Sequence, residues 1–157
     1  MPTRVFSQQP DLVAALPQLL AHARRFFAAE LDVLSSSPPQ RPEPSLAQVT
    51  LRWESARYPG SGTFQIQARA TTNDDRAAAE RAEARGKAGG MAQLAARCQV
   101  VWVITHDGEV TGSAELQLSA LLASVALGPV LPADESTLYG VRGAMERAEK
   151  AAESGAR

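Results

Sequence analysis

Apolar side chains near the N-terminus recur every three or four residues, which is the period of an α-helix. Pro17 falls inside this segment, and we expect it either in the first turn of the helix or at a kink. The pattern predicts one long helix with a single apolar face. Its apolar positions are Leu12, Leu16, Leu19, Ala23, Phe27, Leu31 and Leu34.

A proline-rich segment follows the predicted helix. Residues 35–45 read SSSPPQRPEPS, with four prolines among eleven residues. Such a chain is extended and spans up to about 34 Å at about 3.1 Å per residue. We therefore expect a spacer that lets the N-terminal helix dock on its own chain or on a neighbouring one.

The pattern then changes to strict alternation. Over residues 47–54 the apolar positions Ala47, Val49, Leu51 and Trp53 alternate with polar ones, and residues 63–71 alternate in the same way around Phe64. Period-two alternation is typical of strands with one buried face. The two runs predict an antiparallel hairpin with a polar outer face.

The rest of the chain predicts more helices and a second hairpin. Asn73 and Asp74 are suitable N-terminal residues for a helix that resumes at Met91 after a glycine-rich break. Residues 98–118 alternate again around Asp107 and Gly108, a strong hairpin turn signal. Short and long helical patterns follow over residues 119–127 and 133–153.

Together these segments predict an α+β fold. We expect a four-stranded, mainly antiparallel sheet of two hairpins with helices packed on it, plus an N-terminal helix on a Pro-rich spacer. The expected divisions are an N-terminal helical arm (1–34), a Pro-rich linker (35–45), an α+β domain (46–152) and a flexible tail (153–157). Residues 48–68 and 99–118 also resemble each other, either by chance or because a hairpin–helix unit is repeated.

Composition limits the expected partners and compartment. The 157 residues include 45 % hydrophobic and 21 % charged residues, with only 5 % aromatic. A core with so few large side chains buries little area per residue, so we expect help from oligomerisation. The net charge of −1 provides no global attraction for nucleic acid or membrane, and a single cysteine with no apolar leader or span favours the cytoplasm.

The glycine-rich break is the first candidate for chemistry. It does not match a phosphate-binding loop, because no Ser or Thr follows Lys87 and the loop follows a helix. A Gly-x-x-Gly turn between helices, here Gly86 to Gly89, is used by RNA-binding KH modules. Arg85 stands where that turn expects an apolar residue, so we favour small residues that permit a kink or a close approach to the sheet.

Cys98 and His106 do not form a catalytic pair in this prediction. They lie at opposite ends of one predicted strand, about 26 Å apart at about 3.3 Å per residue. We expect Cys98 to be a buried structural residue. His106, Asp107 and Glu109 could line a hairpin tip, but turn chemistry explains them without a metal. The sequence therefore predicts no catalytic residue, metal or cofactor.

The polar sheet face offers a possible nucleic-acid surface. Long amides and arginines project outward from the first predicted hairpin, close to the glycine turn. Side chains of this kind can contact a nucleic-acid backbone. This alternative function would use Gln48, Arg52, Gln67, Arg69 and Lys87.

The favoured prediction rests on residues 100–104, which are apolar on both faces of a strand. A strand of this kind needs protein cover on both sides. We expect Val101 and Val103 to be covered by the N-terminal helix, through Phe26, Phe27 and Leu31, or by a second copy. The predicted function is a non-catalytic association module, either a homodimerising adaptor or a chaperone-like protein-binding subunit; a small-molecule enzyme is the least expected alternative.

Overall fold

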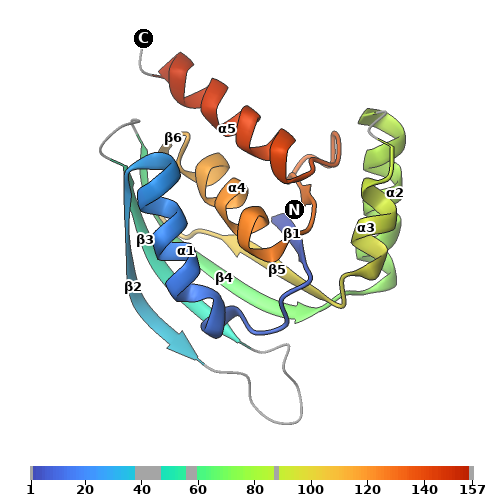
Figure 1. The fold of residues 1–157 in the computed structure, drawn as a ribbon, viewed down its shortest axis with the longest axis horizontal. Coiled ribbons are helices and arrows are strands. Elements are labelled where there is room, and N and C mark those ends of the chain that lie inside the picture. The colour runs from blue at the N-terminus through green and yellow to red at the C-terminus, as the bar shows by residue number, and fades with distance from the viewer. Residues whose placement is uncertain (1, 38–46, 56–59, 87–88, 156–157) are drawn as a thin grey trace.

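The computed structural model describes residues 2–37, 47–55, 60–86 and 89–155, and it has an α+β fold built on an antiparallel sheet (Figure 1). The strand order is β2-β3-β4-β5-β1-β7, and the short strand β6 pairs with β4. The elements are β1 (Thr3–Ser7), α1 (Leu12–Phe27), β2 (Ala29–Ser37), β3 (Gln48–Ser55), β4 (Gly60–Ala70), α2 (Asn73–Gly86), α3 (Met91–Arg97), β5 (Val100–Thr105), β6 (Thr111–Gly112), α4 (Ala114–Ala126), β7 (Val130–Leu131) and α5 (Val141–Gly155).

Helices cover the two faces of the sheet unequally. On one face α1 and α4 contribute to the main hydrophobic core, and α5 packs against α4. On the other face α2 and α3 form a second core with β1, β5 and β7 only. Figure 1 shows α2 and α3 at the end of the sheet away from β2. No helix among the described residues packs on the outer face of β2 and β3, whereas the N-terminus of α2 reaches Arg69 on the same face of β4.

The first predicted hairpin is confirmed. Val49, Leu51 and Trp53 are fully buried, whereas Gln48 and Arg52 on the alternate positions of β3 are exposed. β3 and β4 pair antiparallel from Gln48 opposite Gln67 to Glu54 opposite Ser61. The period-two pattern predicted this pair correctly because only one face of these strands is buried.

The predicted N-terminal helix is wrong in its second part. α1 ends at Phe27, and Ala28 takes a left-handed conformation with φ of 48°. Residues 29–37 then form β2 and pair with β3, so Leu31 and Leu34 lie on a strand. Pro17 lies within α1, beyond its first turn. Of the predicted spacer, Ser35–Ser37 belong to β2 and residues 38–45 lie outside the described residues.

The four-stranded prediction also undercounts the sheet at its other end. Residues 3–7, predicted as part of the helical arm, form β1 between β5 and β7. All five residues of β1 are buried, including Arg4. A five-residue strand buried on both faces has no period-two signal, which is why the sequence did not reveal it.

The second predicted hairpin is wrong as well. β5 pairs with β4 and β1, and after the turn at residues 106–108 only Thr111 and Gly112 extend, pairing with β4. Residues 114–126 form α4, of which ten residues are buried. A helix buried on nearly all sides lacks an amphipathic pattern. The first turn of α4 also has alternating apolar and polar residues, so it was predicted as a strand. The resemblance between residues 48–68 and 99–118 is thus no repeated hairpin.

Candidate functional site

β5 is buried on both faces, as its sequence indicates, but the cover comes from this chain. Val101 is 0 % exposed and Val103 is 8 % exposed. Both belong to the second core, to which α2 and α3 contribute Ala78, Ala79 and Ala95. The predicted covers, the N-terminal helix or a second copy, are not what lies over these valines. Small alanine side chains let both helices approach the strand closely, so β5 needs no partner to be shielded from water.

The aromatic residues of the predicted interface separate into one core residue and one surface residue. Phe27 is 0 % exposed and packs edge-on against Trp53, with ring centroids 6.1 Å apart. Leu31 is also buried in the main core. Phe26 is 37 % exposed, with the guanidinium of Arg25 5.4 Å from its ring centroid. Phe26 is thus the one residue of the five predicted that faces outward.

The polar outer face of the sheet exists, but its charges are mostly negative. Gln48, Arg52 and Gln67 lie on it and are exposed. Asp32 stands opposite Arg52 on the neighbouring strand, and Glu30 stands opposite Glu54. Three exposed carboxylates therefore surround the one exposed arginine of β2 and β3. Lys87, the remaining predicted cation, lies outside the described residues.

Arg69 is on the same face but is already bound. Its Nη1 and Nη2 donate to Asp75 Oδ2 and Oδ1 at 2.6 and 2.9 Å. Arg4 Nη1 donates to Asp75 Oδ1 at 2.9 Å, and the backbone N–H and hydroxyl of Thr72 donate to Oδ2. This network joins β1, β4 and the N-terminus of α2, and we call it the Asp75 cluster.

Burial raises the pKa of Asp75, but hydrogen bonds from Arg69, Thr72 and Arg4 outweigh it and hold the pKa well below the ordinary aspartate value. The hydrogen bond to Asp75 also raises the pKa of Arg69, although burial opposes it. Sequence reasoning missed the cluster. Thr72-x-x-Asp75 is an aspartate version of the capping box, and that spacing could have indicated Asp75.

The glycine-rich break lies between α2 and α3. A Cβ on Gly86 would fall 1.6 Å from Oγ1 of Thr137, so the chain passes close to the segment that precedes α5. Gly90 takes a φ of 92° at the start of α3. Gly86 therefore does lie at a close approach, but the neighbour is Thr137 rather than the predicted sheet.

Cys98 is a buried thiol, as predicted. It is 0 % exposed, its Sγ donates to the carbonyl of Leu94 at 3.3 Å, and burial raises its pKa to about 11. His106 is exposed in the turn after β5, with Nδ1 3.1 Å from the carbonyl oxygen of Gly108. Among the described residues, no group of three or more His, Cys, Asp or Glu side chains is arranged to hold a metal ion.

The two edges of the sheet differ in length and cover. β7 has two residues, and its Val130 also bridges to Tyr139. β2 has nine residues and, within the described part of the chain, pairs only with β3. Its register shifts between Val33 and Ser35, and Leu34 at this bulge is 58 % exposed. Four large apolar side chains among the described residues are exposed, and two of them, Val33 and Leu34, lie on β2.

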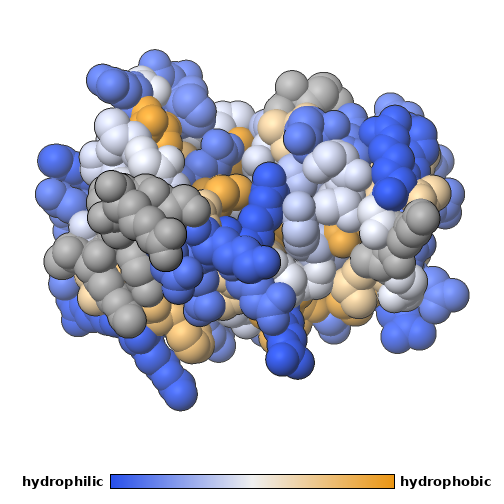
Figure 2. Space-filling view, turned by 90° about the horizontal axis from the view of Figure 1, so that it is seen from above, coloured by the Kyte–Doolittle hydropathy of each residue, from blue (hydrophilic) through white to orange (hydrophobic). Residues whose placement is uncertain are grey.

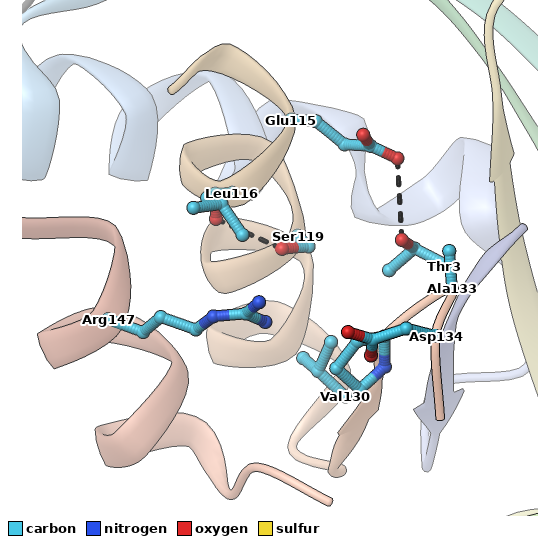
Figure 3. A pocket seen from close by; sticks show the side chains of 9 residues that line it. Thr3, Glu115, Leu116, Ser119, Val130, Ala133, Asp134 and Arg147 are labelled. Carbon is cyan, nitrogen blue, oxygen red and sulfur yellow. Dashed lines mark hydrogen bonds between the residues drawn. The ribbon is translucent and has the colours of Figure 1, made fainter. Parts of the chain in front are cut away.

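A pocket lined by charged and apolar residues lies at the opposite end of the sheet, between β1, α4, α5 and the segment after β7 (Figure 3). Its volume is about 200 Å³. Arg147 points into it from α5, and Glu115 and Asp134 face it from other elements. The remaining lining residues are Thr3, Leu116, Ser119, Val130, Pro132 and Ala133. The view of the molecule from above α5 is mainly hydrophilic, with apolar groups separated by charged ones (Figure 2).

Comparison of the chain with protein-family models, with curated proteins and with solved structures found no match. No helix in the described part of the chain is long and apolar enough to cross a bilayer.

Proposed function

We propose that this protein is a non-catalytic association module that pairs with a second copy of itself through the free edge of β2. The observation that carries the proposal is the nine-residue edge, which has exposed apolar side chains at its centre. An edge strand offers unpaired backbone N–H and C=O groups to another strand. Val33 and Leu34 add apolar contacts at the midpoint of such a pairing.

The distribution of charge along β2 favours antiparallel self-pairing. Glu30 and Asp32 lie in its N-terminal half, whereas Ser35 and Ser36 follow the bulge. Two antiparallel copies centred on Val33 place the acidic half of each strand beside the uncharged half of the other. In this arrangement no carboxylate faces another carboxylate. In a parallel arrangement they would face each other, and their repulsion would destabilise the dimer. A twofold axis is also the commonest symmetry of soluble oligomers.

Nucleic-acid binding is supported less well. A nucleic-acid surface needs cations that can displace counterions from phosphates. On the outer face Arg52 stands among Glu30, Asp32 and Glu54, and Arg69 is neutralised by Asp75. A face of this composition offers little unpaired positive charge to a phosphate backbone. In the part of the chain that the structure describes, no acid–base pair or nucleophile with a suitable environment supports an enzyme, since the thiol of Cys98 is buried and its pKa is raised to about 11.

Sedimentation equilibrium over a dilution series tests the proposal. The chain mass is 16.7 kDa, and we expect a dimer that dissociates on dilution. Replacing Leu34 with Glu places a carboxylate opposite Asp32 of the second copy and should weaken dimerisation at least tenfold, which corresponds to about 1.4 kcal/mol. Leu127→Glu is the matched control, because Leu127 is 53 % exposed but caps α4, away from β2.

Backbone amide exchange separates strand pairing from other contacts. In the dimer, amide protons along β2 should exchange more slowly at high protein concentration than at low concentration. A chain that stays monomeric at every concentration contradicts the proposal. Equal weakening by Leu34→Glu and Leu127→Glu contradicts it too. A salt-dependent shift of labelled single-stranded RNA by the monomer would favour the nucleic-acid alternative instead.

A further inference from the structure

The pocket between α4 and α5 contains opposite charges that the protein keeps apart. Arg147 enters it from α5, Glu115 from α4 and Asp134 from the segment after β7 (Figure 3). Among the described residues no ion pair joins Arg147 to either carboxylate. Charges of opposite sign that line one small pocket without meeting can each receive a different part of a ligand.

Arg147 is oriented by an aromatic ring rather than by an acid. The carbon of its guanidinium lies 4.7 Å from the ring centroid of Tyr139. Stacking of this kind fixes the plane of the guanidinium and leaves its N–H edge free. Two parallel N–H groups on that edge match the two oxygens of a carboxylate. This side of the pocket suits a ligand carboxylate.

The two carboxylates of the pocket suit a cation. Glu115 accepts a hydrogen bond from the hydroxyl of Thr3 at 3.3 Å, and Asp134 accepts one from the backbone N–H of Ser136 at 3.0 Å. The hydrogen bonds from Ser136, and then the charge of Arg147, lower the pKa of Asp134, so it stays ionised. Glu115 also borders the adjoining pocket near His106, so its carboxylate can be reached from two directions.

Size and lining restrict the ligand further. The volume of about 200 Å³ exceeds the roughly 15 Å³ that one water needs, and it is below the roughly 300 Å³ at which drug-sized sites begin. Leu116, Val130 and Pro132 supply apolar contacts between the charged groups. Two carboxylates and one arginine repel a simple anion, whereas a simple cation would leave Arg147 without a partner.

We infer that this pocket binds a small zwitterion, an amino carboxylic acid whose carboxylate contacts Arg147 and whose ammonium lies between Glu115 and Asp134. Short methylene chains between the two ends contact the apolar residues. The site is formed by β1, β7, α4 and α5, so it lies at the end of the sheet opposite β2. Binding here is independent of pairing through β2.

Calorimetric titration with a series of amino acids of increasing length tests this inference. The probes are glycine, β-alanine, 4-aminobutyrate and 6-aminohexanoate, with butyrate and butylamine as controls that carry one charge each. We expect one chain length to bind best, with a Kd of about 1 mM or tighter. Butyrate and butylamine should bind at least about tenfold more weakly, because each leaves one side of the pocket unpaired.

Variants identify the groups that bind. Arg147→Gln and Glu115→Gln should each weaken binding of the best amino acid at least about tenfold. Arg142→Gln is the matched control, since Arg142 is on the same helix, pairs with Glu146 and is 94 % exposed. Because Arg147→Gln also loses the contact with Tyr139, Arg147→Lys is tested beside it. Lysine keeps the charge but lacks the paired N–H groups, so binding should weaken without a change in the thermal midpoint.

Three results would overturn the inference. The first is that no member of the series binds to the wild-type protein. The second is that butyrate binds as tightly as the best amino acid, which would indicate a simple anion site. The third is that Arg147→Gln and Arg147→Lys, folded like the wild type, bind the amino acid unchanged.

Discussion

Replacing Asp75 with Asn should destabilise the protein strongly while leaving its shape almost unchanged. Asp75 is 1 % exposed and accepts five hydrogen bonds from Arg4, Arg69 and Thr72. Asparagine has nearly the same size, but it is neutral and its amide nitrogen cannot accept. The variant therefore removes the carboxylate that Arg4 and Arg69 share, leaving Arg4 with Glu135 at 3.7 Å, without creating a cavity.

The expected loss is about 3 kcal/mol of the free energy of unfolding, the lower end of the range for breaking a buried ion pair. Most of it comes from Arg4, whose side chain is 5 % exposed, so water cannot replace the lost interaction. Arg69 contributes less, because its side chain is 32 % exposed and water replaces part of the interaction. The amide oxygen of asparagine still accepts one hydrogen bond, which keeps the loss at that lower end.

The effect also has a predicted pH dependence. The pKa of Asp75 in the folded state lies below the unfolded value of about 3.9, so the unfolded chain binds the proton first. The stability contributed by Asp75 is complete above about pH 5 and falls as the pH drops through about 4. Asparagine does not titrate. The difference in the free energy of unfolding between the wild type and Asp75→Asn should therefore become smaller as the pH falls.

Urea unfolding followed by circular dichroism measures both effects. Asp74→Asn is the matched control: Asp74 is exposed in the same first turn of α2, and its loss should cost only about 0.3–1 kcal/mol through the helix dipole. If Asp75→Asn is within about 0.5 kcal/mol of Asp74→Asn at pH 7, the Asp75 cluster does not hold β1 to α2 as the buried-pair argument requires. A difference that stays constant down to pH 3 would refute the linkage argument.

Two further predictions follow from close packing near Cys98. A Cβ on Gly128 would lie 1.8 Å from the carbonyl oxygen of Phe6, so Gly128→Ala should cost at least about 2 kcal/mol in thermal or urea unfolding, whereas Gly108→Ala, with nothing within 4 Å, should be nearly neutral. Equal stability of the two variants would contradict the close approach. The thiol of Cys98, buried and with its pKa raised to about 11, should react with a disulfide reagent at pH 8 only as fast as the protein unfolds. Rapid labelling of the folded protein would show that Cys98 is accessible.

Local pattern predicted the parts of the fold that bury one face or that carry clear end signals. The alternation around Leu51 and Phe64 predicted β3 and β4, and the polar start at Asn73 predicted α2. The apolar run of β5 indicated burial on both faces, although not which helices provide it. These predictions succeeded because one-sided burial leaves a period in the sequence.

The same reasoning failed for segments that are buried on every side, and for one segment whose apolar spacing fits both a helix and a strand. β1 and α4 are buried nearly throughout, so their sequences carry no period that separates strand from helix. Ala29, Leu31 and Val33 fit a strand, yet Leu31 and Leu34 also continued the helical spacing of α1. Residues 29–37 form a strand because pairing with β3 gives hydrogen-bond partners to their backbone groups, which a longer helix end would leave exposed.

The chain by itself determined the α+β class, the first hairpin, the helix from Asn73 and the buried nature of Cys98 and β5. Only the tertiary structure determined which residues from distant parts of the sequence are in contact. Arg4 meets Asp75 across 71 positions of sequence, and Arg147, Glu115 and Thr3 meet at one pocket from three elements. Burial by a neighbour and charge compensation depend on contacts between distant segments, and periodicity records only that a residue is buried, not which residue buries it.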